Sequence, residues 1–404
     1  MTQFFILFLV LCAPAYASEM AQIEQRLQRL EEATVLQKPS LKMTSFFQFD
    51  GAVYKTDTDL EQSERTELED GFLFRRARLQ AQGAATPNLS YRLQLNFTGG
   101  EVSILNAFID LKTNWGKFRL GNMKRPSSEA RLRSASDLSF LERPIGTDAL
   151  APDRGQGLAH YTRLMDRFFI MSGVYSGAAE ERDPDVKSAL SVGTRFGGDV
   201  WRSDKNFIQL ATTHLKETSA ENDRFRTDLS SRVSRERILD TDKIKDANQQ
   251  NFHSADLQVS YQSFRLIAEV MMMRLVNRKN LPEASTDFVG TSFEMGYALN
   301  GERRAFDKEV GVFEDLRPVF AIDNGGYGAF EFVARVATLN LNSETDIAQI
   351  QGGKGATYSV ALNWVPKRGL LFIAEGSQME VSERAKNKPD ETIRVLQGRA
   401  QVSF

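Results

Sequence analysis

Cysteine is almost absent from this chain. The only one among 404 residues is Cys12, which lies inside the apolar N-terminal run 4–17. If that run is removed on export, the remaining chain contains no thiol. Disulfide bridges, thiol catalysis and thiolate zinc sites are then excluded.

Histidine is also scarce, and His160, His214 and His253 are the only three. They do not form the H-E-x-x-H pattern of a zinc protease, and the sequence has no G-x-S-x-G segment. In the segment 352–355 (GGKG) the lysine is not followed by the Ser or Thr of a phosphate-binding loop, so we interpret this segment as a hairpin tip. We expect no enzyme activity, no cofactor and no metal site.

Long apolar runs are missing after residue 17, and the mean hydropathy is −0.36. Helical membrane spans, which need about 20 apolar residues, are therefore excluded. A membrane β-barrel is compatible with this composition, because half of each strand faces a wet lumen. The formal net charge of −2 indicates no charged partner, and we expect no binding of nucleic acid.

The N-terminus predicts export. The run 4–17 is uncharged, and Ala15-Tyr16-Ala17 has the small-x-small form of a signal-peptide cleavage site, so we expect residues 1–17 to be a signal peptide cleaved near Ala17. A retained N-terminal anchor is the alternative. In the segment 18–42, Ile23, Leu27 and Leu30 have coiled-coil spacing, which predicts a short helical periplasmic stub; a disordered leader is the alternative.

The last twelve residues, 393–404, alternate between apolar or small and polar side chains. Leu396, Gly398, Ala400 and Val402 form one set, and the residues between them are polar. This period of two is typical of a strand with one apolar and one wet face, and the C-terminal Phe404 suits the aromatic belt of an outer-membrane barrel. A terminal strand of a soluble sandwich is the alternative.

Residues 43–404 contain sixteen such strands, with an uncertainty of about two. Short turns follow most even-numbered strands, as at Met165-Asp166-Arg167, and longer polar connections follow most odd-numbered strands, as at 125–153. Two connections break the rule, because 99–103 is too short and 300–325 is too long. This layout predicts an all-β fold, an antiparallel transmembrane β-barrel. The expected strands are 45–54, 71–83, 90–98, 104–113, 116–124, 154–165, 168–177, 188–196, 206–216, 254–262, 264–275, 287–299, 326–340, 356–365, 369–381 and 391–404.

Strand parity predicts which side chains enter the lumen. The lipid-facing residues Ala77 and Leu79 turn their neighbours inward, and Arg75 is then expected to face outward near the membrane interface. The same reasoning applies to the strands that contain Leu93 and Leu120 and to the terminal strand. The cations that we expect to face inward are Arg76, Arg78, Arg92, Lys117, Arg119 and Arg399.

At 74–97 (FRRARLQAQGAATPNLSYRLQLNF), 108–126 (FIDLKTNWGKFRLGNMKRP) and 138–144 (LSFLERP) the sequence resembles the phosphate-selective porin O and P family. The resemblance continues at 153–157 (DRGQG), 328–332 (GAFEF), 361–364 (ALNW) and the terminal Phe404. No single motif is specific, and the order of the motifs carries the resemblance.

The resemblance implies a homotrimeric sixteen-stranded channel in the bacterial outer membrane, in contact with lipid and lipopolysaccharide, that passes small anions such as phosphate. It also implies that the loop 125–153 narrows a pore lined by arginine and lysine. The matching cations in and beside this loop are Lys124, Arg125, Arg131, Arg133 and Arg143. Rings of cations favour anions in a pore, and guanidinium groups match phosphate oxygens, so the physical argument agrees.

Two alternatives to an anion channel stay open. Inward charges also occur in general porins without anion preference, and the acidic segment 55–70 would repel anions at the pore mouth. A structural anchor of the outer membrane, tied to the periplasm by residues 18–42, is the second alternative.

Overall fold

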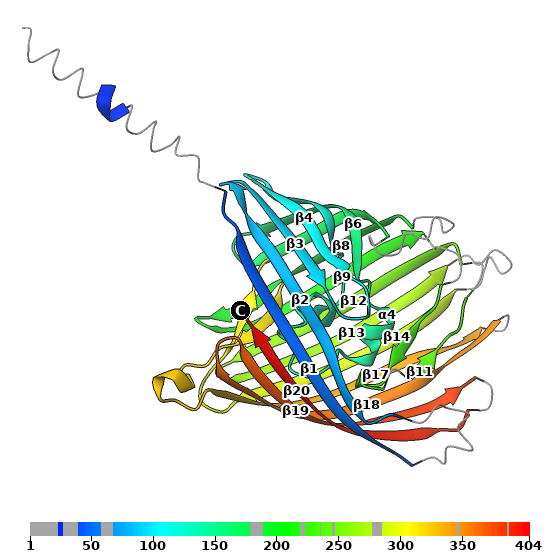
Figure 1. Cartoon of the computed structure of the whole chain (residues 1–404). Helices are drawn as coiled ribbons and strands as arrows, with labels where there is room; N and C mark the ends of the chain where they lie inside the picture. The colour runs from blue at the N-terminus through cyan, green and yellow to red at the C-terminus, as the bar shows by residue number, and fades with distance from the viewer. Residues whose placement is uncertain are drawn as a thin grey trace, which may run out of the picture.

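The computed structural model of the chain describes residues 23–26, 39–57, 68–177, 189–218, 223–234, 236–244, 247–276, 285–345, 348–385 and 388–404. Sixteen antiparallel strands form a closed barrel (Figure 1). This confirms the predicted fold class and strand number. The barrel strands are β1 (Lys42–Thr56), β2 (Gly71–Thr86), β3 (Leu89–Asn96), β4 (Ser103–Thr113), β5 (Gly116–Lys124), β6 (Arg154–Leu164), β7 (Phe168–Ser176), β8 (Ser191–Ser203), β9 (Asn206–Thr218), β12 (Gln249–Tyr261), β13 (Phe264–Val276), β14 (Thr286–Ala298), β17 (Ala329–Thr345), β18 (Ala348–Lys367), β19 (Leu370–Arg384) and β20 (Glu391–Ser403).

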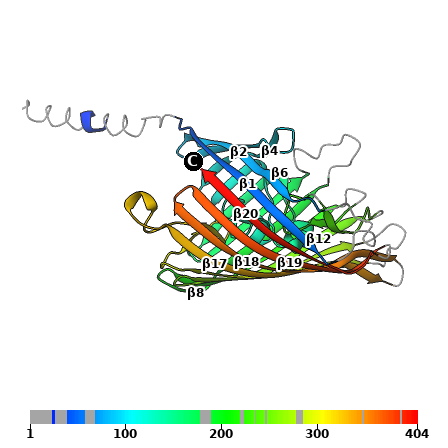
Figure 2. The same cartoon turned by 60° about the horizontal axis from the view of Figure 1, so that its bottom comes forward.

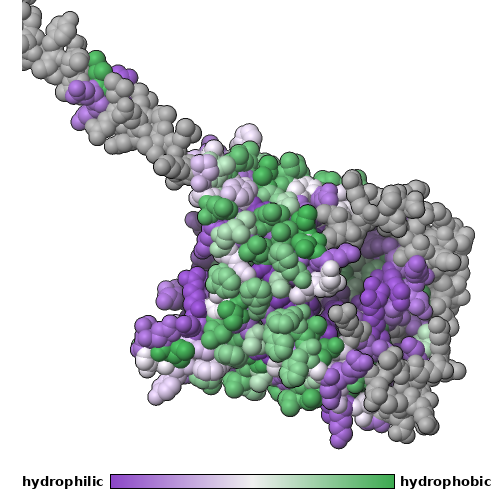
Figure 3. Space-filling model, viewed as in Figure 1, coloured by the Kyte–Doolittle hydropathy of each residue, from purple (hydrophilic) through white to green (hydrophobic). Residues whose placement is uncertain are grey.

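The barrel closes between β1 and β20, which pair along their length in one register. The alternation predicted for the terminal strand is confirmed. Leu396 and Val402 are 66% and 46% exposed on the outer surface, whereas Arg399 between them is buried on the inner side. A broad hydrophobic band covers the outer wall between hydrophilic ends (Figure 3), as expected for strands that face lipid.

The two ends of the barrel differ as predicted. The turn end holds the start of β1, the end of β20 and tight turns, in which Met165, Asp166 and Asp204 adopt φ values between 51° and 53°. Such positive φ angles match the twist of paired strands. The loop end holds the long connections, including 125–153. Both predicted exceptions are present, since 97–102 is a short connection at the loop end and 299–328 a long one at the turn end.

A β-bulge in β2 corrects one predicted facing. Gln48 of β1 pairs with Arg76, but the next pair uses Phe74, so Arg75 has no partner in this ladder. The Arg75 side chain turns into the barrel and donates a 3.0 Å hydrogen bond from Nη2 to Oε2 of Glu142. The prediction that Arg75 faces outward is wrong, because one extra residue shifts the alternation locally.

Three connections fold into the barrel. Loop 125–153 contains α3 (Glu129–Leu132) and α4 (Ile145–Leu150). The connection between β9 and β12 contains a hairpin of β10 (Arg226–Asp228) and β11 (Arg237–Asp240). The connection 299–328 contains a second hairpin of β15 (Arg304–Asp307) and β16 (Val312–Leu316), followed by the short helix η1 (Ile322–Asn324).

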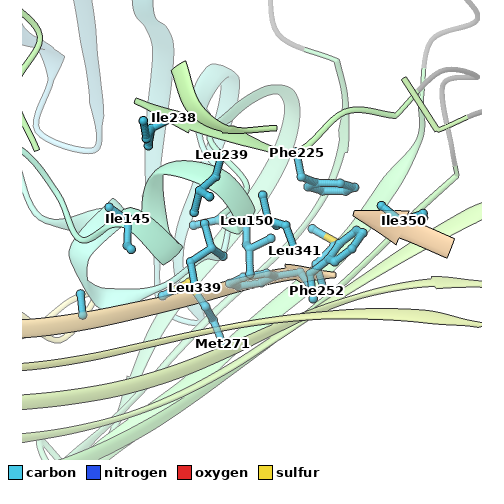
Figure 4. Close-up of a cluster of buried hydrophobic side chains, with 14 of the residues drawn as sticks. Ile145, Leu150, Phe225, Ile238, Leu239, Phe252, Met271, Leu339, Leu341 and Ile350 are labelled. Atoms are coloured by element: carbon cyan, nitrogen blue, oxygen red, sulfur yellow. The ribbon is translucent and has the colours of Figure 1, made fainter. Parts of the chain in front are cut away.

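An apolar core fills one side of the barrel interior (Figure 4). Ile145 and Leu150 of α4 and Leu239 of β11 pack with inward residues of the wall such as Met271 and Leu339. All five are at most 2% exposed, and each such side chain stabilises the fold by about 1.5–3 kcal/mol. The core holds the loop and the β10–β11 hairpin against β12–β14 and β17–β19.

The glycine segment 352–355 has a structural role in this core. It lies inside β18, where pairing with β17 runs on to Thr345 and Ala348, so the interpretation as a hairpin tip is wrong. A Cβ on Gly353 or Gly355 would lie 2.7 or 2.8 Å from the Leu239 side chain. A larger residue at either position would have to displace the Leu239 side chain, because the β10–β11 hairpin approaches the wall closely here.

The N-terminal predictions are only partly within the described residues. Residues 23–26 are helical and exposed, which gives the predicted stub weak support. The predicted signal peptide 1–17 and the remainder of the stub up to residue 38 lie outside the described residues. In the described part of the chain, no helix is long and apolar enough to cross a membrane.

Candidate permeation pathway

A cavity of about 670 Å³ lies between the inner face of β2–β7, loop 125–153 and the β15–β16 hairpin. Among the described residues, eleven Arg or Lys side chains and eight Asp or Glu side chains line it, so its formal charge is positive. Eight of the eleven cations predicted for the pathway belong to this lining. They are Arg76, Arg78, Arg92, Lys117, Arg119, Lys124, Arg131 and Arg143.

Arg78 and Arg92 are the cations best placed to meet a solute. Neither forms an ion pair with a described residue, and each guanidinium lies over an aromatic ring, 5.4 Å from the centre of Phe46 and 5.5 Å from that of Phe108. Both arginines also line a second cavity of about 770 Å³ at the turn end. They therefore connect the two cavities with positive charge that no direct ion pair with a described residue neutralises.

A row of amides accompanies these arginines on the inner wall. Asn106 donates to Gln94 at 2.8 Å, and Gln94 donates to Gln80 at 3.3 Å. All three line the first cavity. Amides add hydrogen-bond donors and acceptors without net charge.

Lys117 and Arg119 have carboxylate partners. Arg119 makes two hydrogen bonds to Asp110, of 2.6 and 2.8 Å, and its guanidinium stacks 3.7 Å from the Phe108 ring centre. Lys117 lies 3.8 Å from Asp110 and forms an ion pair with Glu309, in the tip of the β15–β16 hairpin. These two cations are thus held in place and present less net charge than Arg78 and Arg92.

Cations also shape loop 125–153 itself. The Lys124 amine donates hydrogen bonds of 2.8–3.0 Å to the carbonyl oxygens of Arg131, Leu132 and Arg133. It thereby caps the C-terminal end of α3. Arg143 donates to the carbonyls of Ala130 and Arg133 at 2.7 and 2.8 Å. These bonds fix the loop across the barrel while the side chains stay on the cavity surface.

Three of the predicted pathway cations do not line either large cavity. Arg125 pairs with Glu217 at 2.8 Å, and Arg399 makes two hydrogen bonds of 2.6 and 2.7 Å to Asp50. Arg133 is 2% exposed. It is held between two carboxylates, Glu129 at 2.7 Å and Glu294 at 3.1 Å.

The structure adds three cations that the sequence reasoning did not assign to the cavity, namely Arg75, Arg154 and Arg232. Arg75 was predicted to face outward because the β-bulge in β2 could not be inferred from the alternation of the strand. Arg154 follows Asp153 in the DRGQG motif at the start of β6, so its position beside loop 125–153 could have been inferred. Arg232 comes from the connection that carries the β10–β11 hairpin and binds Asp148 at 2.7 Å, a contact without any sequence signal.

The β15–β16 hairpin forms the acidic side of the cavity. Its backbone is fixed at Gly311, whose carbonyl accepts hydrogen bonds from Gln209 and Gln258 of the wall at 3.2 and 2.7 Å. Arg304 binds Glu331 of β17 at 2.7 Å and fixes the base of the hairpin. Asp307, Glu309 and Glu314 line the cavity, so this hairpin places negative charge in the pathway.

The carboxyls around the cavity differ in acidity. Burial raises the pKa of Glu142, but Arg75, Arg76 and Arg399 outweigh it and hold that pKa well below its ordinary value. For Asp137 burial dominates and raises the pKa. Burial likewise raises the pKa of Asp307 and Glu314, and in Glu314 the nearby Asp307 and Asp137 add to the rise. Glu142 is thus a fixed charge, whereas the other three protonate in milder acid than usual.

No group of three or more His, Cys, Asp or Glu side chains in the described part of the chain is arranged to hold a metal ion.

Sequence comparison identifies the family. Residues 47–404 match the family described as phosphate-selective porin O and P. An uncharacterised protein of Caulobacter vibrioides is 25% identical over 319 residues, which are 75% of this chain and 61% of that protein. The chain therefore spans less than two thirds of the length of this relative.

Solved structures with the same fold include an outer-membrane protein and a porin. OmpT of Vibrio cholerae has a TM-score of 0.55 and 10% identity, and covers 91% of this chain and 98% of its own. The anion-selective porin from Comamonas acidovorans has a TM-score of 0.55 and 11% identity over 91% of this chain and 100% of its own. A trimer form of OmpT has a TM-score of 0.54 and 10% identity over 91% of this chain and 100% of its own.

Proposed function

The chain belongs to the phosphate-selective porin O and P family, and we propose that it is an outer-membrane diffusion channel that prefers small anions. The observation that carries the proposal is the pair Arg78 and Arg92, two lumen guanidinium groups without a described carboxylate partner at the junction of two cavities. The Coulomb attraction between a guanidinium and an anion about 4 Å away is about 1 kcal/mol at a water-like dielectric constant. An attraction of this size suits passage better than tight binding.

We propose that the anion enters at the loop end, passes loop 125–153 and leaves past Arg78 and Arg92 at the turn end. The turn end would then face the periplasm, since short turns lie there in outer-membrane barrels. Phosphate is the solute that the family name and the guanidinium chemistry support. Arg78 lies over Phe46 of β1 and Arg92 over Phe108 of β4, so the two arginines offer successive contacts to a phosphate along the pathway.

We further propose a homotrimer that contacts lipid and lipopolysaccharide. Support comes from the trimer form of the similarly folded OmpT and from the apolar outer wall. We propose that the chain has no catalytic role.

A channel without anion preference is the second candidate. The eight carboxylates in the cavity favour it, above all those of the β15–β16 hairpin, because they oppose the cationic wall and produce a transverse field. The two candidates share one fold and one pathway. They differ in whether the positive charge of Arg78 and Arg92 outweighs the cavity carboxylates in setting the ion selectivity.

Phosphate block of chloride current in planar bilayers separates these possibilities. We predict that phosphate added to KCl reduces the single-channel current of the wild type, and that Arg78→Gln/Arg92→Gln abolishes this block. Arg394→Gln, which removes a cation from the outer face of β20, should keep it. Conductance without block in the wild type would favour a general channel, and the absence of conductance would favour a structural anchor.

A further inference from the structure

The segment 318–328, which follows the inner β15–β16 hairpin, exposes an unusual number of apolar side chains. Val319, Phe320, Ile322 and Tyr327 are 63%, 68%, 44% and 82% exposed. The segment protrudes at the turn end of the barrel, the same end as the C-terminus (Figures 1 and 2). Apolar side chains gathered on a protruding loop indicate a contact surface.

The 318–328 loop is a built structure that holds these side chains outward. The Gly328 amide donates to the Phe320 carbonyl at 2.9 Å, and the Gly326 amide to the Ala321 carbonyl at 3.0 Å, so the loop is closed at its base. Gly325 takes a φ of 75°, which ends η1 with a sharp turn. These bonds fix the backbone of the loop in a conformation in which its apolar side chains are exposed.

The loop is attached to the aromatic belt on the outer wall. The Trp364 indole donates to the Tyr327 carbonyl at 2.9 Å, and Lys367 binds Asp323 at 3.3 Å. Trp364 stacks with Phe330 and Phe372 on the neighbouring strands, with ring centres 5.9 and 5.5 Å apart. Belts of this kind mark the level of the interface between membrane and water, so the bond to Trp364 places the loop at that level.

Lipid is the occupant that this position favours. Beyond Trp364 and Phe330 along the same strands, the outward residues Phe332, Leu362 and Val360 are 51%, 43% and 51% exposed and belong to the apolar outer wall. The apolar surface of the loop continues this lipid-facing wall.

We propose that the 318–328 loop is a membrane anchor, which inserts Val319, Phe320, Ile322 and Tyr327 into the interfacial region of the leaflet at the turn end. This goes beyond the channel function and requires only that the barrel lies in a membrane. Because the same connection carries the inner β15–β16 hairpin, the anchor also braces that hairpin from outside the barrel.

Site-directed spin labelling tests the proposal in the full chain reconstituted in phospholipid vesicles. Cys12 is replaced by Ser, and a nitroxide is attached at Phe320→Cys or, as the matched control in the same loop, at Asn324→Cys. Oxygen partitions into lipid, and a neutral nickel chelate stays in water, so power saturation with each reagent reports the depth of the label. We expect the label at 320 to be more accessible to oxygen than to nickel, and the label at 324 to show the reverse.

Two results would overturn the proposal. Nickel accessibility at 320 equal to that at 324 would place the loop in water, and protection of 320 from both reagents would show that protein, such as a second copy of the chain, covers it. A Val319→Ser/Phe320→Ser variant distinguishes this outcome from a failure of the channel proposal, since we expect its single-channel conductance to equal that of the wild type.

Discussion

Arg399 on the last strand and Asp50 on the first form a bidentate ion pair across the seam that closes the barrel. The Arg399 Nε and Nη2 atoms lie 2.7 and 2.6 Å from the two carboxylate oxygens of Asp50, and both side chains are at most 3% exposed. The two residues are also direct partners in the β1–β20 ladder. Closure of the barrel and pairing of the charges therefore depend on each other.

Removal of one member of this pair should weaken the barrel. We predict that Arg399→Gln lowers the free energy of unfolding by about 3–5 kcal/mol, because Asp50 stays buried without its partner. Urea unfolding in lipid vesicles measures the change. Arg394→Gln on the outer face of the same strand is the control and should change the free energy by less than about 1 kcal/mol. Equal losses in both variants would show that the pair is not important for closure.

Loop 125–153 contains two arginines with different roles. Arg131 lines the cavity, whereas Arg133 is buried between Glu129 and Glu294. We predict that Arg131→Gln lowers the anion-to-cation permeability ratio and costs less stability than Arg133→Gln, because Arg131 loses chiefly a 2.7 Å bond to the Thr147 carbonyl and a 3.5 Å pair with the half-exposed Asp153. Arg133→Gln should instead destabilise the protein by several kcal/mol, because it leaves two buried carboxylates uncompensated. Reversal potentials and urea unfolding of both variants test this, and an unchanged reversal potential for Arg131→Gln would contradict it.

The hairpin carboxylates should oppose anion passage. We predict that Asp307→Asn/Glu309→Gln raises the anion-to-cation permeability ratio, because the cavity loses two negative charges and Lys117 loses its partner Glu309. The control is Asp287→Asn, which removes a carboxylate that lines neither of the two cavities. If the double variant behaves like the control, the hairpin has no influence on selectivity.

Acid should strengthen the anion preference. The pKa values of Asp137, Asp307 and Glu314 are raised by burial, so these groups bind protons at a higher pH than ordinary carboxyls, which titrate near about pH 4. As the pH falls from neutral towards about 4, these carboxyls are neutralised before ordinary ones, so the cavity loses negative charge while its arginines stay charged. The reversal potential in a KCl gradient should therefore move further towards that of chloride. The triple variant Asp137→Asn/Asp307→Asn/Glu314→Gln should lose this shift, and a wild-type preference that falls in acid would contradict the prediction.

The barrel could be predicted from sequence because alternation is a local property. Each strand shows its two faces in its own residues, and Leu396, Arg399 and Val402 lie on the sides that their parity predicts. Arg75 shows the limit of this reasoning. A bulge depends on how two strands pair, and nothing within β2 alone indicates it.

The segments that fold into the barrel, and the partners of its inward cations, were less predictable. They depend on contacts between residues far apart in the chain. The unusual length of 300–325 was visible in the sequence, but the insertion of its hairpin depends on Gln209 and Gln258, about 100 and 50 residues away. Arg399 is compensated by Asp50 of the first strand, and Arg133 by Glu294 of β14 as well as by Glu129 of its own loop. The inward facing of these cations could therefore be predicted, but their availability to a solute could not. Arg78 and Arg92 differ from these two in lacking such partners among the described residues.

The reversal potential of the wild-type channel in a tenfold KCl gradient tests the central claim most directly. An anion-preferring lumen predicts a potential with the sign of the chloride equilibrium potential, whose limit is about 59 mV. Arg78→Gln/Arg92→Gln should move it towards zero. A potential with the sign of the potassium equilibrium potential, or one that the double variant leaves unchanged, would contradict the claim that these two arginines give the channel its anion preference.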